Sequence, residues 1–236
     1  MEKNYTSAVE KVEIDQGLKN YFIGIYNHMA GGLLITALSA YVVANTFLIR
    51  LMFNAQGGMS VFGWLFLFAP LIAVLCFGRV VSRWTLKQVR RFFIGFSVLM
   101  GFSLSPIFLA YTGASMARVF LITAGTFGAM SLYGYTTKRD LISMGSFLQM
   151  GLLGWIIAVI VNIFMKSSAF DYALSMLSVV IFVGLTAYDT QKIREIYMAY
   201  DDSDVRGREV ILGALSLYLD FINLFMALLR LMGDRR

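Results

Sequence analysis

Long apolar runs separated by short polar loops fill almost the whole chain after residue 20. A helix needs roughly 20 mostly apolar residues to cross the hydrocarbon core of a bilayer. Runs of about that length lie at residues 21–49, 60–77, 92–111, 117–135, 142–164, 172–190 and 210–229. No run alternates in polarity as a barrel strand does, and backbone groups in lipid need internal hydrogen-bond partners. The pattern predicts an all-α integral membrane protein with seven transmembrane helices.

The chain divides into a polar N-terminal segment, residues 1–20, and a single transmembrane domain, residues 21–236. The first apolar run is too long for the core of a signal peptide and lacks a small-residue cleavage site, so we expect it to be a retained helix. Pro70 and Pro106 lie inside the second and third runs. We expect kinks at both prolines, because proline removes a helical hydrogen bond.

Composition agrees with this pattern, since 58% of the residues are apolar and only 14% are charged. Soluble domains have roughly 45–50% apolar and about 25% charged residues. The formal net charge is +6, but the basic residues lie in short loops between the apolar runs, so we expect no nucleic-acid partner. The sequence shows no phosphate-binding glycine loop, no metal-spaced His or Cys cluster and no Ser/His constellation, and we therefore predict neither a cofactor nor an enzyme.

The basic residues also predict an orientation. Fourteen lysines and arginines lie in residues 1–20 and the even-numbered loops, whereas the opposite loops contain only Arg50, Arg118 and Lys166. The positive-inside rule then places the N-terminus in the cytoplasm. The three arginines of the C-terminal tail lie outside if the seventh run crosses fully and inside if it is re-entrant. We favour seven crossings, because the cytoplasmic side still has more basic residues than the opposite side when the three tail arginines are counted outside.

Two acidic residues, Asp189 and Asp220, lie inside the sixth and seventh runs, whereas the other acids lie in loops, tails or span edges. A charged side chain at the centre of a membrane helix costs roughly 2.5–3.5 kcal/mol even on insertion scales, so such residues usually mark an ion pathway, a proton relay or a pair. Helical spacing from Asp220 leads to Gly213, Ser216, Asn223 and Ala227. This small and polar stripe is expected to face the interior of the bundle.

The depth of the two aspartates in the membrane decides whether they can form a pair. Asp220 is expected roughly 15 Å from the cytoplasmic start of its helix. Asp189 would be only about 5 Å deep if its helix ended at Lys192, but roughly 12 Å deep if the helix continued to Tyr197. Consecutive helices are antiparallel, so in the second case we expect the carboxyl groups to meet. The alternative is that each aspartate separately binds a neighbouring hydroxyl group or arginine.

Several strings around these residues resemble the bacterial branch of the Bax inhibitor family: FGAMSLYGYTTKRDL, GLTAYDTQ and, above all, LSLYLDFINLFMALLR. The resemblance covers nearly the whole chain from Tyr21. It implies a seven-helix protein of the bacterial inner membrane, in which six helices wrap a central C-terminal helix. It also implies a pH-sensitive calcium leak gated by two aspartates, which match Asp189 and Asp220. A basic residue at the cytoplasmic end of the second helix belongs to the family pattern, and either Arg79 or Arg83 matches it.

The implied mechanism has a physical basis. Two neighbouring carboxylates in a medium of low dielectric cannot both ionise cheaply, so they are expected to share a proton. Loss of that proton would draw in a basic side chain or a cation. Calcium prefers six to eight oxygen ligands, and Asp189, Asp220, Ser216 and Asn223 supply too few. We therefore predict a transient calcium site completed by water along the ion pathway, with the lipid bilayer and other membrane proteins as partners.

Two other functions are compatible with the sequence. Two aspartates on adjacent helices are similar to the catalytic pair of intramembrane aspartyl proteases, but those enzymes have Gly-x-Gly-Asp at the second aspartate, where this chain has LYLD. The chain could instead be a regulator that binds a membrane protease or another membrane partner and transports nothing. That function requires no special residues.

Overall fold

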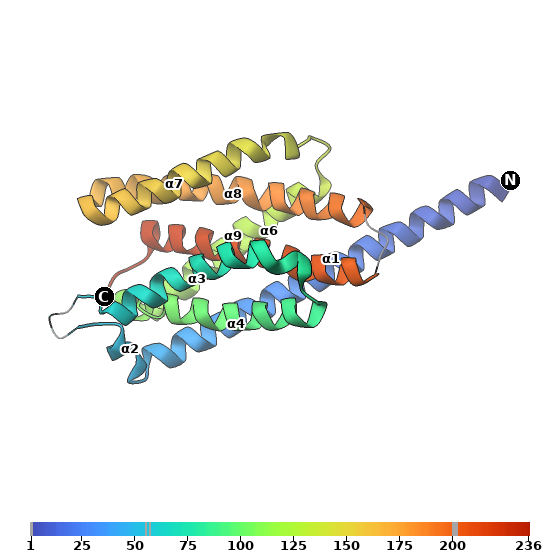
Figure 1. The fold of residues 1–236 in the computed structure, drawn as a ribbon. Coiled ribbons are helices and arrows are strands. Elements are labelled where there is room, and N and C mark those ends of the chain that lie inside the picture. Colours follow the sequence, from blue (N-terminus) through green and yellow to red (C-terminus); the bar gives the residue numbers. More distant parts are fainter. Residues whose placement is uncertain (1, 55, 57, 200–202) are drawn as a thin grey trace.

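A computed structural model of the chain describes residues 2–54, 56, 58–199 and 203–236, and within them the regular structure is helical apart from two isolated β-bridges (Figure 1). Seven helices of this described part are long and apolar enough to cross a membrane. They are α1 (Glu2–Ala44), α3 (Val61–Val80), α4 (Leu86–Leu104), α6 (Gly113–Thr136), α7 (Gly145–Met165), α8 (Ser168–Ala199) and α9 (Ser203–Met232). The prediction of seven transmembrane helices is confirmed.

The first helix differs from its predicted limits at both ends. Helix α1 ends at Ala44 rather than at residue 49, and the separate helix α2 (Leu48–Leu51) follows. The side chains of Asn45 and Thr46 bind the carbonyl oxygens of Tyr41 and Val43, and such local bonds compete with continuation of a helix. Helix α1 begins at Glu2, so it includes the predicted N-terminal segment from that residue on, and its first turns extend beyond the bundle (Figure 1).

The two prolines act differently on their helices. Helix α4 ends at Leu104, and Pro106 precedes the short helix α5 (Ile107–Ala110), so the third crossing is interrupted where a proline cannot donate a backbone hydrogen bond. Pro70 lies within a continuous α3. Two 3₁₀ helices, η1 (Val81–Arg83) and η2 (Ile142–Met144), lie in the connections after α3 and before α7.

Successive long helices run in opposite directions, so the two ends of the bundle carry different connections (Figure 1). The C-terminal tail reaches the α5–α6 connection: Thr112 donates a backbone hydrogen bond to Asp234, and the Arg118 guanidinium lies 2.8 Å from the Asp234 carboxylate. The start of α9 lies at the opposite end, where Arg208 donates to the carbonyl oxygen of Trp84. Helix α9 therefore crosses the bundle completely, as the seven-span interpretation requires.

Helix α9 is the most buried of the long helices. It packs against α1, α4, α6 and α8, whereas α3 packs mainly on α4 and α7 mainly on α8. Its buried side chains include Leu217, Tyr218 and Leu224, each with 0% exposure. This arrangement is consistent with the predicted central C-terminal helix, although α3 and α7 lie outside the four helices that cover it.

Close helix contacts fix the position of α8 within this core. A Cβ atom added to Gly134 of α6 would lie 2.3 Å from the carbonyl oxygen of Ala187 on α8, so only glycine allows this approach. On the other side of α8, a Cβ atom at Gly213 of α9 would lie 3.1 Å from the Cδ1 atom of Ile193. Helix α8 is thus held between α6 and α9 near the middle of the bundle.

Candidate functional site: a buried carboxyl pair

The structure brings the two intramembrane aspartates together from adjacent helices. Helix α8 continues to Ala199, so Asp189 lies roughly 15 Å from the end of its helix. The sequence predicts that the two aspartates lie at the same depth if this helix continues to Tyr197, and it does so. The carboxyl group of Asp189 lies within interaction range of the Asp220 carboxyl group and of the Ser216 hydroxyl group, both on α9. Asp189 and Asp220 form the carboxyl pair, and Ser216 supplies a hydroxyl group beside it.

Asp220 is the more enclosed member of the pair. Its side chain is among the buried ones, with 4% of the residue exposed. Its Oδ2 atom is fully buried and has no hydrogen-bond donor among the described residues. An unsatisfied buried oxygen is costly, and a carboxylate can only accept hydrogen bonds. A proton carried by one of the two carboxyl groups would supply the missing donor, so the arrangement suits a pair that holds one proton.

Lys192 is the basic residue that acts most strongly on Asp189 in the described structure. It lies one helical turn further along α8, with its ammonium group 5.8 Å from the centre of the Tyr188 ring. Its side chain is exposed, whereas Asp189 is half-buried and Asp220 is buried. In the sequence, Lys192 stands out only as a possible end of the helix. Its spacing of three residues from Asp189 is the signal that could have identified it.

Arg79 and Arg83, the two alternatives for the basic residue of the family pattern, lie away from the pair. Both side chains are exposed, and Arg79 donates a hydrogen bond to the carbonyl oxygen of Leu75, one turn earlier in α3. Arg83 ends the 3₁₀ helix that follows. Among the described residues neither arginine binds a carboxylate, and α3 packs mainly on α4 rather than on α8 or α9. Their action on the pair stays a prediction.

The predicted stripe on α9 is only partly joined to the pair. Ser216 is half-buried and faces Asp189. Asn223 is half-buried too, but its amide nitrogen donates to the carbonyl oxygen of Leu219 in its own helix. Gly213 and Ala227 are buried in the packing of α9. Ser216 is therefore the member of the stripe that adds an oxygen atom to the site in this structure.

Few strong metal ligands gather around the pair. Within the described parts of the chain, no group of three or more His, Cys, Asp or Glu residues is placed to hold a metal ion. Two carboxyl groups and one hydroxyl group supply fewer oxygens than the six to eight that calcium prefers. Water would have to complete the coordination, which suits a weak and short-lived cation site.

Two chains of hydroxyl groups hold the helices that carry the pair. The Thr36 hydroxyl on α1 donates to the carbonyl oxygen of Ser97 on α4 at 2.9 Å and accepts from the Tyr218 hydroxyl on α9 at 2.6 Å. Tyr218 and Thr36 are both buried. Each hydroxyl has one proton to give, so Tyr218 must be the donor in this pair. This network fixes α9 against α1 and α4 close to Asp220.

The second chain fixes α8. The Tyr26 hydroxyl on α1 lies 2.5 Å from the Ser131 hydroxyl on α6, which lies 3.0 Å from the hydroxyl of Thr190, the residue after Asp189. Thr190 in turn donates to the carbonyl oxygen of Thr186. Because each hydroxyl group has one proton to donate, Ser131 donates to Thr190 and Tyr26 donates to Ser131. Neither network is evident from the sequence, because hydroxyl groups are common in membrane helices and their partners here are far apart in the chain.

Comparison with known sequences identifies the family. Residues 18–236 match the family described as "Inhibitor of apoptosis-promoting Bax1". The matched range includes every helix that contributes to the carboxyl pair. The chain belongs to the Bax inhibitor family. The family resemblance inferred from the aspartate-containing strings is thereby confirmed.

Several bacterial proteins are similar to this chain over nearly their full length. "Uncharacterized protein RP147" of Rickettsia prowazekii is 45% identical over 235 residues, which is 99% of this chain and 98% of the relative. "Inner membrane protein YbhL" of Escherichia coli K12 is 44% identical over 223 residues, or 93% and 94% of the two chains. A relative from Caulobacter vibrioides is 40% identical over 233 residues, or 95% and 92%. With the seven apolar helices, these likenesses support a multi-pass inner membrane protein.

Proposed function

We propose that this Bax inhibitor family member is a pH-sensitive leak for calcium and similar cations, gated by Asp189 and Asp220. The observation that carries the proposal is the buried carboxyl group of Asp220, which interacts with the Asp189 carboxyl group and whose Oδ2 atom has no hydrogen-bond partner among the described residues. In a membrane interior such a pair is expensive to keep. One member of the pair, Asp220, lies on α9, the most buried helix, and this position favours a functional role over simple helix packing.

The pair couples proton loss to cation entry. With one proton shared, the carboxyl groups carry a single negative charge, which Lys192 partly offsets. Loss of the shared proton adds a second charge in a medium of low dielectric, where repulsion between the carboxylates is strong. A cation at the pair relieves this repulsion. Because ligands must be deprotonated to bind metal, cation binding at the pair is expected to strengthen as the pH rises and to release a proton.

A weak site is what a leak requires. An ion must bind well enough to enter the pathway but must also leave it. Asp189, Asp220 and Ser216 supply only part of a calcium coordination sphere, and water supplies the rest. Asn223 lies one turn beyond Asp220 and would offer its carbonyl oxygen further along α9. Either Arg79 or Arg83 would compete with the cation for the ionised pair if α3 moved toward it.

We also propose that the end of the bundle with most basic residues faces the cytoplasm, which places the N-terminus inside. Reporter enzymes fused after Lys138 and after Lys166 test this orientation. The first fusion is expected to read cytoplasmic and the second external. A C-terminal fusion is expected to read external, because the tail lies beside the α5–α6 connection. The reverse pattern would overturn the orientation but not the fold.

Reconstitution of the purified protein in liposomes with an entrapped calcium indicator tests the function. Calcium flux that changes with pH supports the leak. Cleavage of a transmembrane peptide without flux would assign the aspartates to proteolysis instead. Neither activity, in protein shown to be folded, would contradict the leak and favour a regulator that binds a membrane protease or another membrane protein.

A further inference from the structure

A groove of about 640 Å³ runs between α1 and α6 on the outside of the bundle. Its walls are mostly apolar and include Ile23, which is 46% exposed, and Leu132, which is 63% exposed. The hydroxyl groups of Tyr26 and Ser131 also line it, but each already takes part in the chain that ends on α8. These two hydroxyl groups are therefore satisfied without water, and the apolar walls around them suit an apolar chain.

Lys19 of α1 and Tyr135 of α6 line the same groove. Lys19 lies close to Gln16, where the apolar part of α1 begins, and Tyr135 precedes the last residue of α6. This part of the groove therefore lies at the expected level of the bilayer surface. An apolar groove that carries an exposed ammonium group at that level matches the shape of an anionic lipid, whose charged headgroup lies above its hydrocarbon chain.

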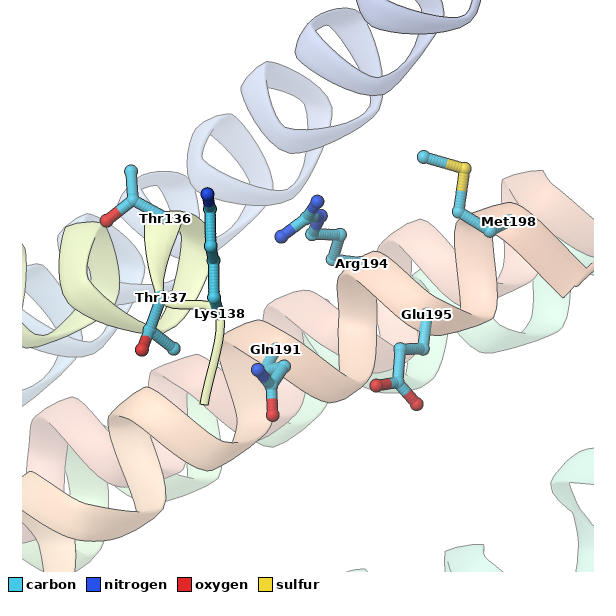
Figure 2. A pocket seen from close by; sticks show the side chains of 7 residues that line it. All are labelled: Thr136, Thr137, Lys138, Gln191, Arg194, Glu195 and Met198. Atoms are coloured by element: carbon cyan, nitrogen blue, oxygen red, sulfur yellow. The ribbon is translucent and has the colours of Figure 1, made fainter. Parts of the chain in front are cut away.

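A second hollow, of about 580 Å³, lies beyond the end of α6 (Figure 2). Lys138, Arg194 and Glu195 line it, and the carboxylate of Glu195 points away from the side chains of Lys138 and Arg194 (Figure 2). Arg194 donates one hydrogen bond to the carbonyl oxygen of Tyr135, and its guanidinium is 6.0 Å from the Tyr135 ring. Tyr135 therefore connects this basic hollow with the groove.

The positive charges of this region have few partners of opposite sign. Neither Lys19 nor Lys138 forms an ion pair within the described residues. Asp140, next in the loop, accepts hydrogen bonds from the backbone nitrogens of Ile142 and Ser143. The Arg194 guanidinium has five N–H donors and uses one of them on Tyr135. Donors for an anionic group are therefore present from three different elements: α1, the α6–α7 connection and α8.

We propose that the groove between α1 and α6 and the basic hollow beside it bind one anionic phospholipid. Its phosphate contacts Lys138, Arg194 and Lys19, and one acyl chain lies along the groove. Lipid tails are as apolar as leucine side chains, so the groove alone cannot select one lipid over its neighbours. Selection comes from the charges, because basic pockets between membrane helices bind anionic headgroups. This site is separate from the carboxyl pair and does not depend on the proposed leak.

Native mass spectrometry of the purified protein tests the proposal with two lipids of equal chain length. The protein is equilibrated with equal amounts of phosphatidylglycerol, which is anionic, and phosphatidylethanolamine, which is zwitterionic. The unmodified chain is expected to retain one phosphatidylglycerol molecule in preference. Each basic residue near the surface contributes enough attraction to change the preference by about fivefold. Lys19→Gln and Lys138→Gln are each expected to lower the preference for phosphatidylglycerol about fivefold. Lys87 is an exposed lysine of α4 at the same end of the bundle, and Lys87→Gln is expected to leave the preference unchanged.

A second pair of variants tests the acyl-chain groove. Gly128 lines the groove and a Cβ atom there would meet no atom within 4 Å, so Gly128→Leu introduces a bulky side chain at the groove from a position that accepts a Cβ atom. Gly125, also on α6, has equally open surroundings but does not line the groove, and Gly125→Leu is the matched control. Gly128→Leu is expected to remove the retained lipid, and Gly125→Leu to leave it in place.

Three outcomes would overturn the lipid site. The first is equal retention of the two lipids by the unmodified chain. The second is a preference that survives both lysine substitutions and Gly128→Leu. The third is displacement of the lipid by inorganic phosphate alone, or occupation of the groove by a second copy of the chain. Calcium flux is not measured in this experiment, so its result is independent of the proposed leak.

Discussion

Helices α7 and α9 are almost equally apolar but occupy opposite places in the molecule. The mean hydropathy of the most apolar segment is 2.1 in the crossing that contains α7 and 1.9 in the one that contains α9. Yet none of that segment is buried in the crossing that contains α7, whereas 67% of it is buried in the crossing that contains α9. Helix α7 packs mainly on α8, whereas α9 contacts four other helices. Hydropathy therefore predicts which helices cross the membrane but not which of them lies in the centre.

The difference follows from the small and polar residues. Lipid tails are as apolar as leucine, so burying apolar surface between helices gives little free energy in a membrane. Helices associate through close packing at small residues and through hydrogen bonds. Helix α9 has Gly213, Ser216, Tyr218 and Asp220 within two turns, and each meets another helix. In α7 the indole nitrogen of Trp155 donates to Leu174 of α8, but most side chains face the lipid.

The largest expected loss of stability comes from a methyl group added in the interior. In Gly134→Ala the new Cβ atom would lie 2.3 Å from the carbonyl oxygen of Ala187, which belongs to the backbone of α8 and cannot rotate away. Overpacking of this kind costs about 1–3 kcal/mol of unfolding free energy. Gly154→Ala on α7 is the matched change in open surroundings and is expected to cost little. Unfolding of both variants in detergent micelles measures the difference, and equal stabilities would contradict the interior contact.

A smaller loss is expected from the hydroxyl network of α9. Thr36→Val removes the acceptor of the buried Tyr218 hydroxyl and the donor to Ser97. Hydrogen bonds between membrane helices average about 0.6 kcal/mol and reach about 1.7 kcal/mol, so we expect a loss of roughly 1 kcal/mol in unfolding free energy. Thr126→Val is the control, because the exposed Thr126 on α6 binds only a carbonyl oxygen of its own helix. A loss at Thr126 as large as that at Thr36 would show that the network adds nothing.

Much of the fold was predictable because each crossing needs a long apolar run. The seven helices follow from the lengths of the apolar runs, and the third crossing is interrupted beside Pro106, one of the two prolines where a kink is expected, whereas α3 continues through Pro70. The ends of α1 were not predictable from hydropathy, since the polar residues 2–20 continue the helix and Asn45 and Thr46 end it. The packing order of the helices depends on contacts such as Gly134 with Ala187, whose residues are far apart in the sequence.

The candidate site was predictable in part for a similar reason. A buried charge is so costly in a membrane that Asp189 and Asp220 stand out from the sequence alone. Their meeting depended on the length of α8, which the apolar residues after Lys192 indicated correctly. The direction of the Asn223 amide toward its own helix could not be predicted, because spacing gives the face of a helix but not the rotamer. The influence of Lys192 on Asp189, in contrast, was predictable from their spacing of three residues on one helix.

The most direct test of the central claim compares calcium flux into liposomes for three variants over a range of acid to neutral pH: Asp189→Asn, Asp220→Asn and the double variant. If the two carboxyl groups share a proton, either single substitution removes the coupling, and we expect each to abolish the pH dependence of the flux. The double variant is then expected to resemble the single variants, because groups that act as a unit are not additive.

Asp171→Asn is the control for these measurements. Asp171 lies at the start of α8, and its half-exposed carboxylate is 3.6 Å from the Arg230 guanidinium, so its loss is expected to change flux little. The account predicts a flux that no longer responds to pH in both single variants and in the double variant. Single variants that keep the normal pH response, or defects that simply add in the double variant, would contradict the gate and leave the aspartates as packing groups.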